Sequence, residues 1–218
     1  MNKNTVLIAV VSIFGTFLLL FGVYKLVNQP TQTDFPQTKQ IKAEDHIKWR
    51  TDKDSKNILV EYSDFQCPSC KNVHDIFKTI EASNSPDFGI TKNITFIFRY
   101  FPLYQIHDKA YLSAYAAEAA GIQGKFWEMS DLLFTNQTAW STSNDPLKEY
   151  FLGYAKQLQL NVDQFSKDIN SGKVKDRINQ DLLEAGQIGI DSTPTFFLNG
   201  KKVDVSSFDE LKTLLKSI

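Results

Sequence analysis

The sequence predicts an α/β domain preceded by one apolar N-terminal helix, and three observations support this fold class. Short apolar runs at residues 58–62 and 94–100 have the composition of buried strands, and a helical pattern lies between them. A long stretch with helical periodicity follows, over about residues 104–189. A strand–turn–strand signal then occupies residues 195–203, and an apolar helical face closes the chain. This order predicts a sheet covered by helices, with a helical insertion.

The composition fits one folded domain with an accessory segment. The chain has 218 residues, of which 42% are hydrophobic, and this is enough for a substantial core. Its 24 Lys and Arg residues balance 25 Asp and Glu residues. Charge therefore indicates neither nucleic-acid binding nor a strongly acidic partner.

Residues 5–24 form an uncharged run about long enough to cross a bilayer as a helix. The short N-terminal region, residues 1–4, precedes it, and Lys25 follows it. A cleaved signal peptide would have a shorter apolar core and a small-residue cleavage site, whereas a buried core helix would show a polar stripe. The run has no small-residue cleavage site after it and no polar stripe within it. We therefore interpret it as an uncleaved transmembrane anchor. Lysines on both sides leave its orientation open.

Residues 25–43 are polar, contain two prolines and predict a linker that holds the folded domain away from the membrane. The folded domain is expected over residues 44–218. Within it, the helical insertion is expected at about residues 104–189.

The first half of the domain predicts a strand–helix–strand unit. Residues 58–62 lead through a short polar turn into Cys67, and Pro68 is suited to the first position of a helix. Apolar residues at helical spacing follow, and the second strand covers residues 94–100. We therefore expect two neighbouring buried strands with the helix between them in sequence.

The second half predicts helices, a hairpin and a last helix. Three helical faces are expected in the insertion, formed by Ala110, Ala114 and Ala117, by Leu147, Tyr150, Phe151, Tyr154 and Leu158, and by Val174, Ile178 and Leu182. Asn199-Gly200 is the strongest short hairpin signal, and it separates the strands 195–198 and 201–203. Phe208, Leu211, Leu214 and Leu215 predict the closing helix.

The only two cysteines form the motif Cys67-Pro68-Ser69-Cys70. Cys67 lies where the strand passes into the helix, and unpaired N–H groups and the helix dipole favour a thiolate there. Cys70 lies one turn further along, within disulfide reach, and can resolve a mixed disulfide formed at Cys67. We therefore predict a redox-active dithiol.

Other roles for this pair fit less well. A structural disulfide between residues three apart would close too short a loop to stabilise the fold much. A zinc site would need two more ligands, and the histidines are scattered, at His46, His74 and His107. Lys71 instead of histidine follows Cys70, which excludes covalent haem attachment. No metal or cofactor is expected.

Three further residues fit a thiol-exchange mechanism. Glu61 lies on the strand before Cys67, and a carboxyl group buried there would have a raised pKa and could accept the proton of Cys70. An exposed Glu61 is an equally good interpretation from position alone. Thr193 and Pro194 precede the hairpin, and a cis peptide there would bring the Thr193 backbone beside the cysteines. The sequence does not decide the isomer.

Other conspicuous residues are expected to have structural positions and no role in catalysis. His74 is expected to be an exposed helical histidine, and His107 to belong to the turn that enters the insertion. Trp127 and Trp140 are expected in the insertion, in its core or on its surface.

Several separated motifs, in order, resemble the DsbA-like thioredoxin family. They are Val60–Cys70, Phe98–Leu103, the Ala-rich helix after His107, Gly124–Trp127 and Thr193–Gly200. The resemblance covers about residues 44–218. It implies a thioredoxin-like fold interrupted by an α-helical insertion, and disulfide exchange on extracytoplasmic proteins.

The resemblance also implies roles for individual residues. Cys67 matches the exposed attacking cysteine and Cys70 the buried resolving one. Glu61 matches the buried acidic position, and Pro194 matches the cis-proline. The Pro-Ser dipeptide between the cysteines differs from the Pro-His of strong oxidants, which leaves the direction of exchange open.

The resulting hypothesis is a disulfide donor on the outer face of a cell membrane, anchored by one span and monomeric. Its partners would be proteins with free thiols or disulfides and, as the resemblance implies, a quinone-coupled membrane protein that reoxidises it. A reductase or isomerase of the same fold is the alternative within this class. An anchored binding or holdase module is the alternative outside it.

Overall fold

The computed structural model describes residue 2 and residues 13–24, 33–49, 57–82, 93–144, 146–205 and 207–216. The chain divides into two units, Met1–Thr33 and Asp34–Ile218.

In the first unit, residues 13–24 are helical, and their large apolar side chains are exposed. The predicted span, residues 5–24, lies partly outside the described residues, because residues 3–12 are not among them. Within the part of the chain that the structure does describe, no helix has both the length and the apolar character needed to cross a bilayer. The expected transmembrane helix is therefore not found there.

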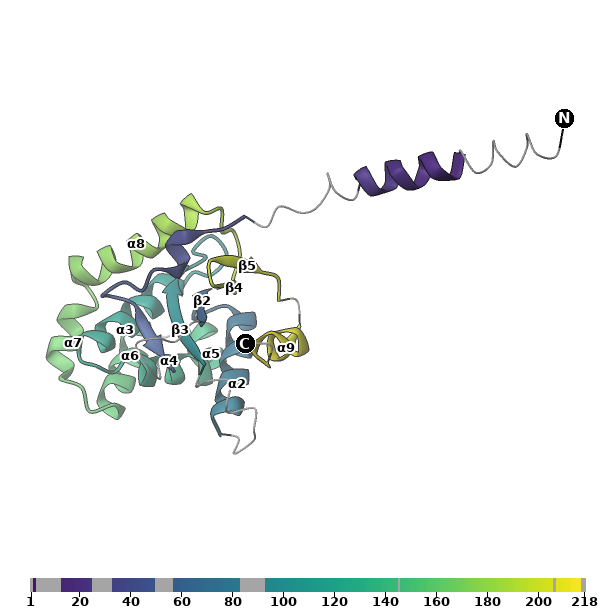
Figure 1. The fold of residues 1–218 in the computed structure, drawn as a ribbon. Helices are drawn as coiled ribbons and strands as arrows, with labels where there is room; N and C mark the ends of the chain where they lie inside the picture. Colours follow the sequence, from purple (N-terminus) through teal and green to yellow (C-terminus); the bar gives the residue numbers. More distant parts are fainter. Residues whose placement is uncertain are drawn as a thin grey trace. The chain divides into compact units, whose positions relative to one another are not determined.

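The second unit is built on a five-stranded sheet (Figure 1). Its strands are β1 (His46–Lys48), β2 (Asn57–Ser63), β3 (Ile94–Tyr100), β4 (Thr195–Leu198) and β5 (Lys201–Val203), in the spatial order β1-β3-β2-β4-β5. β2 and β3 are parallel, and the other neighbours are antiparallel.

The two central strands are buried on both faces, which explains their nearly continuous apolar sequences. Leu59 pairs with Phe96, and Val60 pairs with Ile97. The predicted strands and hairpin are confirmed. β1 has only three residues, too few for a periodic signal, and was not predicted.

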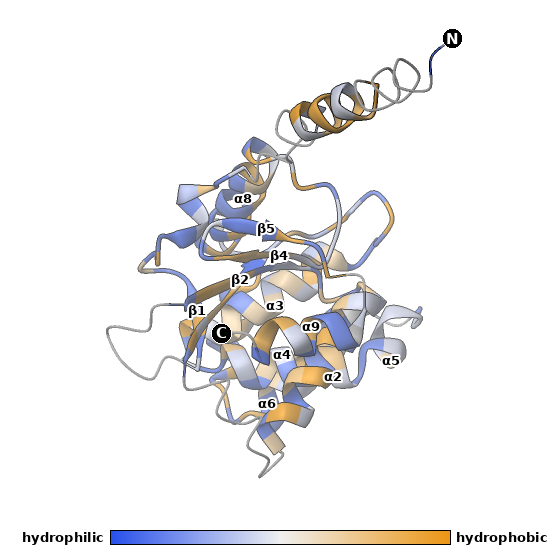
Figure 2. Cartoon of the chain, turned by 45° about the vertical axis from the view of Figure 1, so that its right-hand side comes forward, coloured by the Kyte–Doolittle hydropathy of each residue, from blue (hydrophilic) through white to orange (hydrophobic). Residues whose placement is uncertain are grey.

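Helices cover both faces of the sheet (Figure 2). On one face, α2 (Pro68–Ala82) and α9 (Phe208–Lys216) pack on β2, β3 and β4 through one apolar cluster. On the other face, α8 (Gly172–Gln187) contributes Ala185 to a cluster with Val60 and Phe197.

The helical insertion lies between β3 and β4, as predicted. It comprises α3 (Ala110–Ile122), α4 (Phe126–Thr135), α5 (Gln137–Ser141), α6 (Leu147–Gln157), α7 (Val162–Asp168) and α8. The alanines of α3 are fully buried, which allows close packing of the neighbouring helices. The shorter helices α4, α5 and α7 were not predicted.

Residues 34–43 differ from the predicted linker because part of this segment packs on the sheet edge. The 3-10 helix η1 (Pro36–Lys39) lies in it, and Thr38 is fully buried. The N–H of Phe35 donates to the carbonyl of Gly200 at 2.7 Å, and its ring packs edge-on against Phe197. The folded unit thus begins near Asp34 instead of Glu44.

Candidate active site

The turn between β2 and α2 presents Cys67 at the start of the helix. The carbonyl of Cys67 accepts from the N–H of Lys71 at 3.1 Å, so Cys67 occupies the N-cap position and Pro68 the first helical position. The N–H of Cys67 itself donates to the carbonyl of Asp64 at 3.1 Å. The unpaired N–H groups of this first turn favour a negative charge on the sulfur.

Cys67 has the acidity of an activated thiol. Hydrogen bonding to the Cys70 thiol, together with backbone N–H groups of Cys70 and Ser69, lowers the pKa of Cys67 to about 5 although burial opposes ionisation. The expectation that Cys67 is exposed is wrong, since only 6% of the residue is accessible. The backbone turn at Thr193 contacts the Cys67 sulfur. Both cysteines are free thiols in this structure. Pro68 and Ser69 are the exposed residues of the motif.

Cys70 is the buried member of the pair, with 1% of the residue exposed. Burial, followed by hydrogen bonding to Cys67 and the charge of Glu61, raises the pKa of Cys70 well above the ordinary thiol value. The two sulfurs therefore differ strongly in acidity although they lie within one helical turn.

Glu61 is buried on β2, with 3% of the residue exposed. Burial raises the pKa of its carboxyl group from 4.5 to about 8. The interpretation of Glu61 as an exposed strand residue is thereby excluded, because helices cover both faces of this central strand. Glu61 and Cys70 line the same small cavity.

The Thr193–Pro194 peptide bond is cis. The thiol of Cys67 donates to the Thr193 carbonyl at a sulfur–oxygen distance of 3.5 Å, so this turn lies directly beside the cysteine. Pro194 also lines an open groove of about 540 Å³, together with Ser69, Val73 and Leu211.

Gln137 is a site residue for which the sequence carries no recognisable signal. It is buried on α5, and its Nε2 donates to the carbonyls of Phe65 at 2.8 Å and Cys67 at 2.9 Å. The helical insertion thus holds the backbone of the active-site turn.

Asp64 fixes the other side of the same turn. Its carboxylate accepts from the N–H of Gln66 at 2.8 Å and from the N–H of Leu103 at 2.9 Å. His107 Nδ1 lies 2.7 Å from the same carboxylate. His107 belongs to the turn before α3, as expected, but it also supports the active-site turn.

The expectation that His74 is exposed is wrong, because α4 covers that face of α2. Its side chain is 10% exposed, its Nε2 lies 2.9 Å from Asp131, and its ring stacks on Phe134.

Trp140 is fully buried in the insertion, whereas Trp127 packs against Phe96 and Phe98 of the sheet. Among the residues that the structure describes, no group of three or more His, Cys, Asp or Glu side chains is arranged to hold a metal ion. The chemistry that the described side chains support is thiol–disulfide exchange.

The thioredoxin family model matches residues 45–217. The chain belongs to the thioredoxin family. In this thioredoxin-family chain, Cys67 opens the helix after a central strand, and the cis Thr193–Pro194 bond lies opposite it.

Solved structures share this fold. BdbD from Bacillus subtilis superposes with a TM-score of 0.65 at 22% identity, covering 80% of this chain and 92% of that chain. MdbA, a thiol-disulfide oxidoreductase from Corynebacterium diphtheriae, superposes with a TM-score of 0.61 at 18% identity, covering 87% and 94%. At these identities the likeness shows the fold.

A curated relative, the Na(+)/H(+) antiporter NhaA 1 of Mycolicibacterium gilvum, is 32% identical over 200 residues. The match covers 90% of this chain and 30% of that protein. The thioredoxin-family chain therefore spans less than a third of the length of this relative.

Proposed function

We propose that this protein is a thiol–disulfide oxidoreductase that donates disulfides to other proteins. The observation that carries the proposal is the geometry of the pair: Cys67 caps the start of α2 beside the cis Thr193–Pro194 turn, and Cys70 is buried one helical turn further along. These surroundings lower the pKa of Cys67 and raise that of Cys70. A stabilised thiolate stabilises the reduced pair, and this makes the oxidised pair a stronger disulfide donor.

The exchange proceeds through Cys67. A substrate thiolate attacks Cys67 in the oxidised pair, so that the Cys67–Cys70 bond breaks, a mixed disulfide forms and Cys70 leaves. Cys70 takes a proton from Glu61, which is available because its pKa is about 8. A second substrate thiolate then attacks the substrate sulfur of the mixed disulfide. The substrate disulfide forms, and Cys67 is released as its stabilised thiolate.

The groove beside Pro194 is the proposed place for the substrate chain. It borders Thr193 and Ser69, next to Cys67, and its apolar walls include Val73, Phe196 and Leu211. A volume of about 540 Å³ suits an extended segment of an unfolded protein with apolar side chains near its cysteine.

The proposed location is the outer face of a cell membrane, with residues 5–24 as a single span and the catalytic domain outside. The uncharged sequence of that run supports an anchor, and oxidative chemistry suits an extracytoplasmic compartment. The proposed partners are secreted proteins with free thiols and a quinone-coupled membrane protein for reoxidation. The names of the structural neighbours MdbA, a thiol-disulfide oxidoreductase, and α-DsbA1 of Wolbachia pipientis support this class of activity. A monomer is proposed.

The test is disulfide formation in a reduced, unfolded substrate protein by the full-length chain in detergent. We expect the wild type to form substrate disulfides and Cys67→Ser to lose the activity. A reduction potential nearer to about −120 mV than to about −270 mV is expected for a donor. The lower value would indicate a reductase instead. If the wild type forms no substrate disulfides but suppresses substrate aggregation, and Cys67→Ser retains that suppression, the protein is a holdase.

A further inference from the structure

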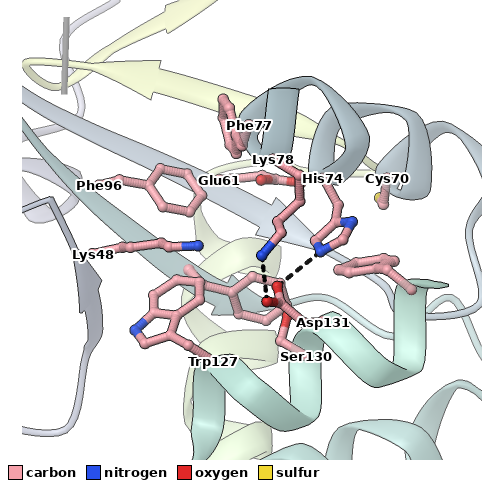
Figure 3. Close-up of a pocket in the computed structure, with 12 residues that line it drawn as sticks. Lys48, Glu61, Cys70, His74, Phe77, Lys78, Phe96, Trp127, Ser130 and Asp131 are labelled. Carbon is pink, nitrogen blue, oxygen red and sulfur yellow. Dashed lines mark hydrogen bonds and ion pairs between the residues drawn. The ribbon is translucent and has the colours of Figure 1, made fainter. Parts of the chain in front are cut away.

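A small cavity lies beside Cys70, lined by residues of β1, β2, β3, α2 and α4 (Figure 3). Its volume is about 20 Å³, which is room for one water molecule. Its walls are both polar and apolar, and they include Glu61, Cys70, Ser130 and Asp131. Most of the wall is apolar and aromatic, and Glu61, Cys70 and Ser130 supply the polar partners that a buried water needs.

Residues at one end of the cavity, the dry end, are buried, and residues at the other end, the wet end, are exposed to solvent. At the dry end, Glu61 and Cys70 are 3% and 1% exposed, and Phe98 beside them is 2% exposed. At the wet end, the side chains of Lys78 and Asp131 are 45% and 32% exposed. The cavity thus lies between the buried carboxyl group and side chains in contact with solvent.

Asp131 organises the wet end. Its carboxylate lies 2.7 Å from the ammonium group of Lys78 and 2.9 Å from His74 Nε2 (Figure 3). Although burial opposes it, hydrogen bonds from His74 and Lys78 lower the pKa of Asp131 to about 2, so this carboxylate is ionised at every working pH.

The other cation at this end, Lys48, also has an anionic partner. Its ammonium group lies 2.7 Å from Glu81. The charged or titratable groups that line the cavity with Glu61 are therefore Cys70, His74 and Lys78 from α2, Lys48 from β1 and Asp131 from α4. Cys67 adds a charge from the far side of Cys70. Within the described part of the chain, no ion pair involves Glu61, because Asp131 and Glu81 hold the two lysines.

We propose that one water in this cavity carries the proton between Glu61 and solvent, and that Asp131 is the positioning residue that holds Lys78 and His74 at the outlet. This inference rests on the proposed function, because it concerns the proton that Cys70 gains or loses. Asp131 belongs to the helical insertion, whereas Glu61 and Cys70 belong to the strand–helix unit. The insertion therefore forms the outlet for a proton that the sheet side of the site accepts.

The proton balance is complete without any further reactant. When the Cys67–Cys70 bond breaks, Cys70 leaves as a thiolate and receives the proton of Glu61. The Glu61 carboxylate then takes a proton from the cavity water, and that water takes one from solvent beside Lys78. Reoxidation runs the same transfers in reverse.

Asp131→Asn tests the positioning role. It removes the negative charge that pairs with Lys78, so the ammonium charge of Lys78 acts more strongly on Glu61 and favours its carboxylate. We expect the pKa of Glu61 to fall by about one unit, a tenfold loss of proton affinity. Infrared titration of the carboxyl band in the full-length reduced protein measures this pKa, and Glu61→Gln identifies the band.

Lys78→Met is expected to shift the pKa of Glu61 in the opposite direction. It removes a cation and leaves the Asp131 charge less compensated, so the pKa of Glu61 is expected to rise. General loosening of the α2–α4 contact would move both variants in the same direction. Glu128→Gln is the matched control, because Glu128 lies on α4 as Asp131 does and pairs with Lys125 at 2.7 Å. The Glu128 and Lys125 side chains are 45% and 43% exposed. Glu128→Gln should leave the pKa of Glu61 unchanged.

The rate of mixed-disulfide formation with a reduced dithiol peptide is the second readout. We expect its pH dependence to shift with the pKa of Glu61 in Asp131→Asn and Lys78→Met. Unchanged titration and unchanged pH profiles in both folded variants would overturn the proposed outlet, while wild-type exchange would leave the proposed function intact. Loss of exchange in the wild type would overturn the function, and the infrared titration would still decide the role of Asp131.

Discussion

At the scale of single residues, the two sulfurs are made different by what surrounds them. Cys67 has hydrogen-bond donors at a helix start, whereas Cys70 is enclosed by the core and by Glu61. Each donor that favours the Cys67 thiolate lowers the free energy of the reduced pair. The acidity of Cys67 is therefore the quantity that sets the direction of exchange.

Cys70→Ala is expected to raise the pKa of Cys67 by at least about one unit, because hydrogen bonding to Cys70 is the largest cause of its lowered pKa. Alkylation by iodoacetamide as a function of pH measures this. In the wild type, reactivity should rise through about pH 5, and the variant's profile should lie at higher pH. An unshifted profile would assign the acidity to the helix start alone.

The lowered pKa of Cys67 also makes the stability of the reduced protein depend on pH. The folded pKa of Cys67 lies below its ordinary value of 9.0. Its ionisation therefore stabilises the reduced fold fully above about pH 9, and this contribution is lost as the pH falls toward 5.

At the scale of elements, the helical insertion supports the redox turn. Gln137 of α5 reaches two backbone carbonyls of the turn, and Lys109 caps α5 by donating to the carbonyls of Ser141 at 2.7 Å and Ser143 at 2.6 Å. The N–H of Lys109 also donates to the side chain of Gln66 at 2.7 Å. The position of Cys67 thus depends on α5 as well as on α2.

Gln137→Met should destabilise the protein by about 2 kcal/mol, because it removes two buried hydrogen bonds and leaves the N–H of Lys71 as the remaining described donor to the Cys67 carbonyl. Urea unfolding of the reduced protein measures the loss. Gln123→Met is the control, since the Gln123 side chain also makes two hydrogen bonds to backbone, donating to the carbonyl of Asn161 at 3.1 Å and accepting from its N–H at 2.8 Å. Because this site is exposed, the cost should stay within about 0.5 kcal/mol. Equal effects of the two variants would contradict the role of Gln137.

At the scale of the whole domain, a buried charge cluster ties the N-terminal segment to the sheet and to α8. The guanidinium of Arg99 is fully buried and donates to the Asp45 carboxylate at 3.2 Å and to the Gln40 carbonyl at 2.8 Å. Glu184 of α8 pairs with Arg99 and also with Lys42 at 2.6 Å. Residues 34–45 are thereby part of the fold.

Arg99→Met should cost about 3–5 kcal/mol, because the fully buried Asp45 carboxylate keeps Arg177, at the longer distance of 3.9 Å, as its described cationic partner. Equilibrium unfolding in urea measures this. Lys39→Met removes an exposed ion pair with Asp34 and should cost less than about 1 kcal/mol. The double variant Arg99→Met with Asp45→Asn should recover part of the loss, and failure to recover any would contradict the charge argument.

Local sequence patterns were enough to predict strands β2 to β5, the longer helices in their order, and the position of the dithiol at a helix start. Those features follow from local periodicity, from Pro68 and from Asn199-Gly200, whose φ angles of 51° and 83° fit the tight hairpin. Neighbouring residues along the chain carry this information, so no distant contact is needed to read it.

Local patterns could not predict that Glu61 and His74 are covered, that the Thr193–Pro194 bond is cis or that Gln137 and Asp131 reach the site. Each of these depends on segments far apart in sequence, as Gln137 and Cys67 are. A polar residue on a short helix gives no sign of which distant backbone it will contact. The redox chemistry of Cys67 and Cys70 could therefore be predicted from the sequence. Their electrostatic surroundings depend on how the insertion packs against the sheet.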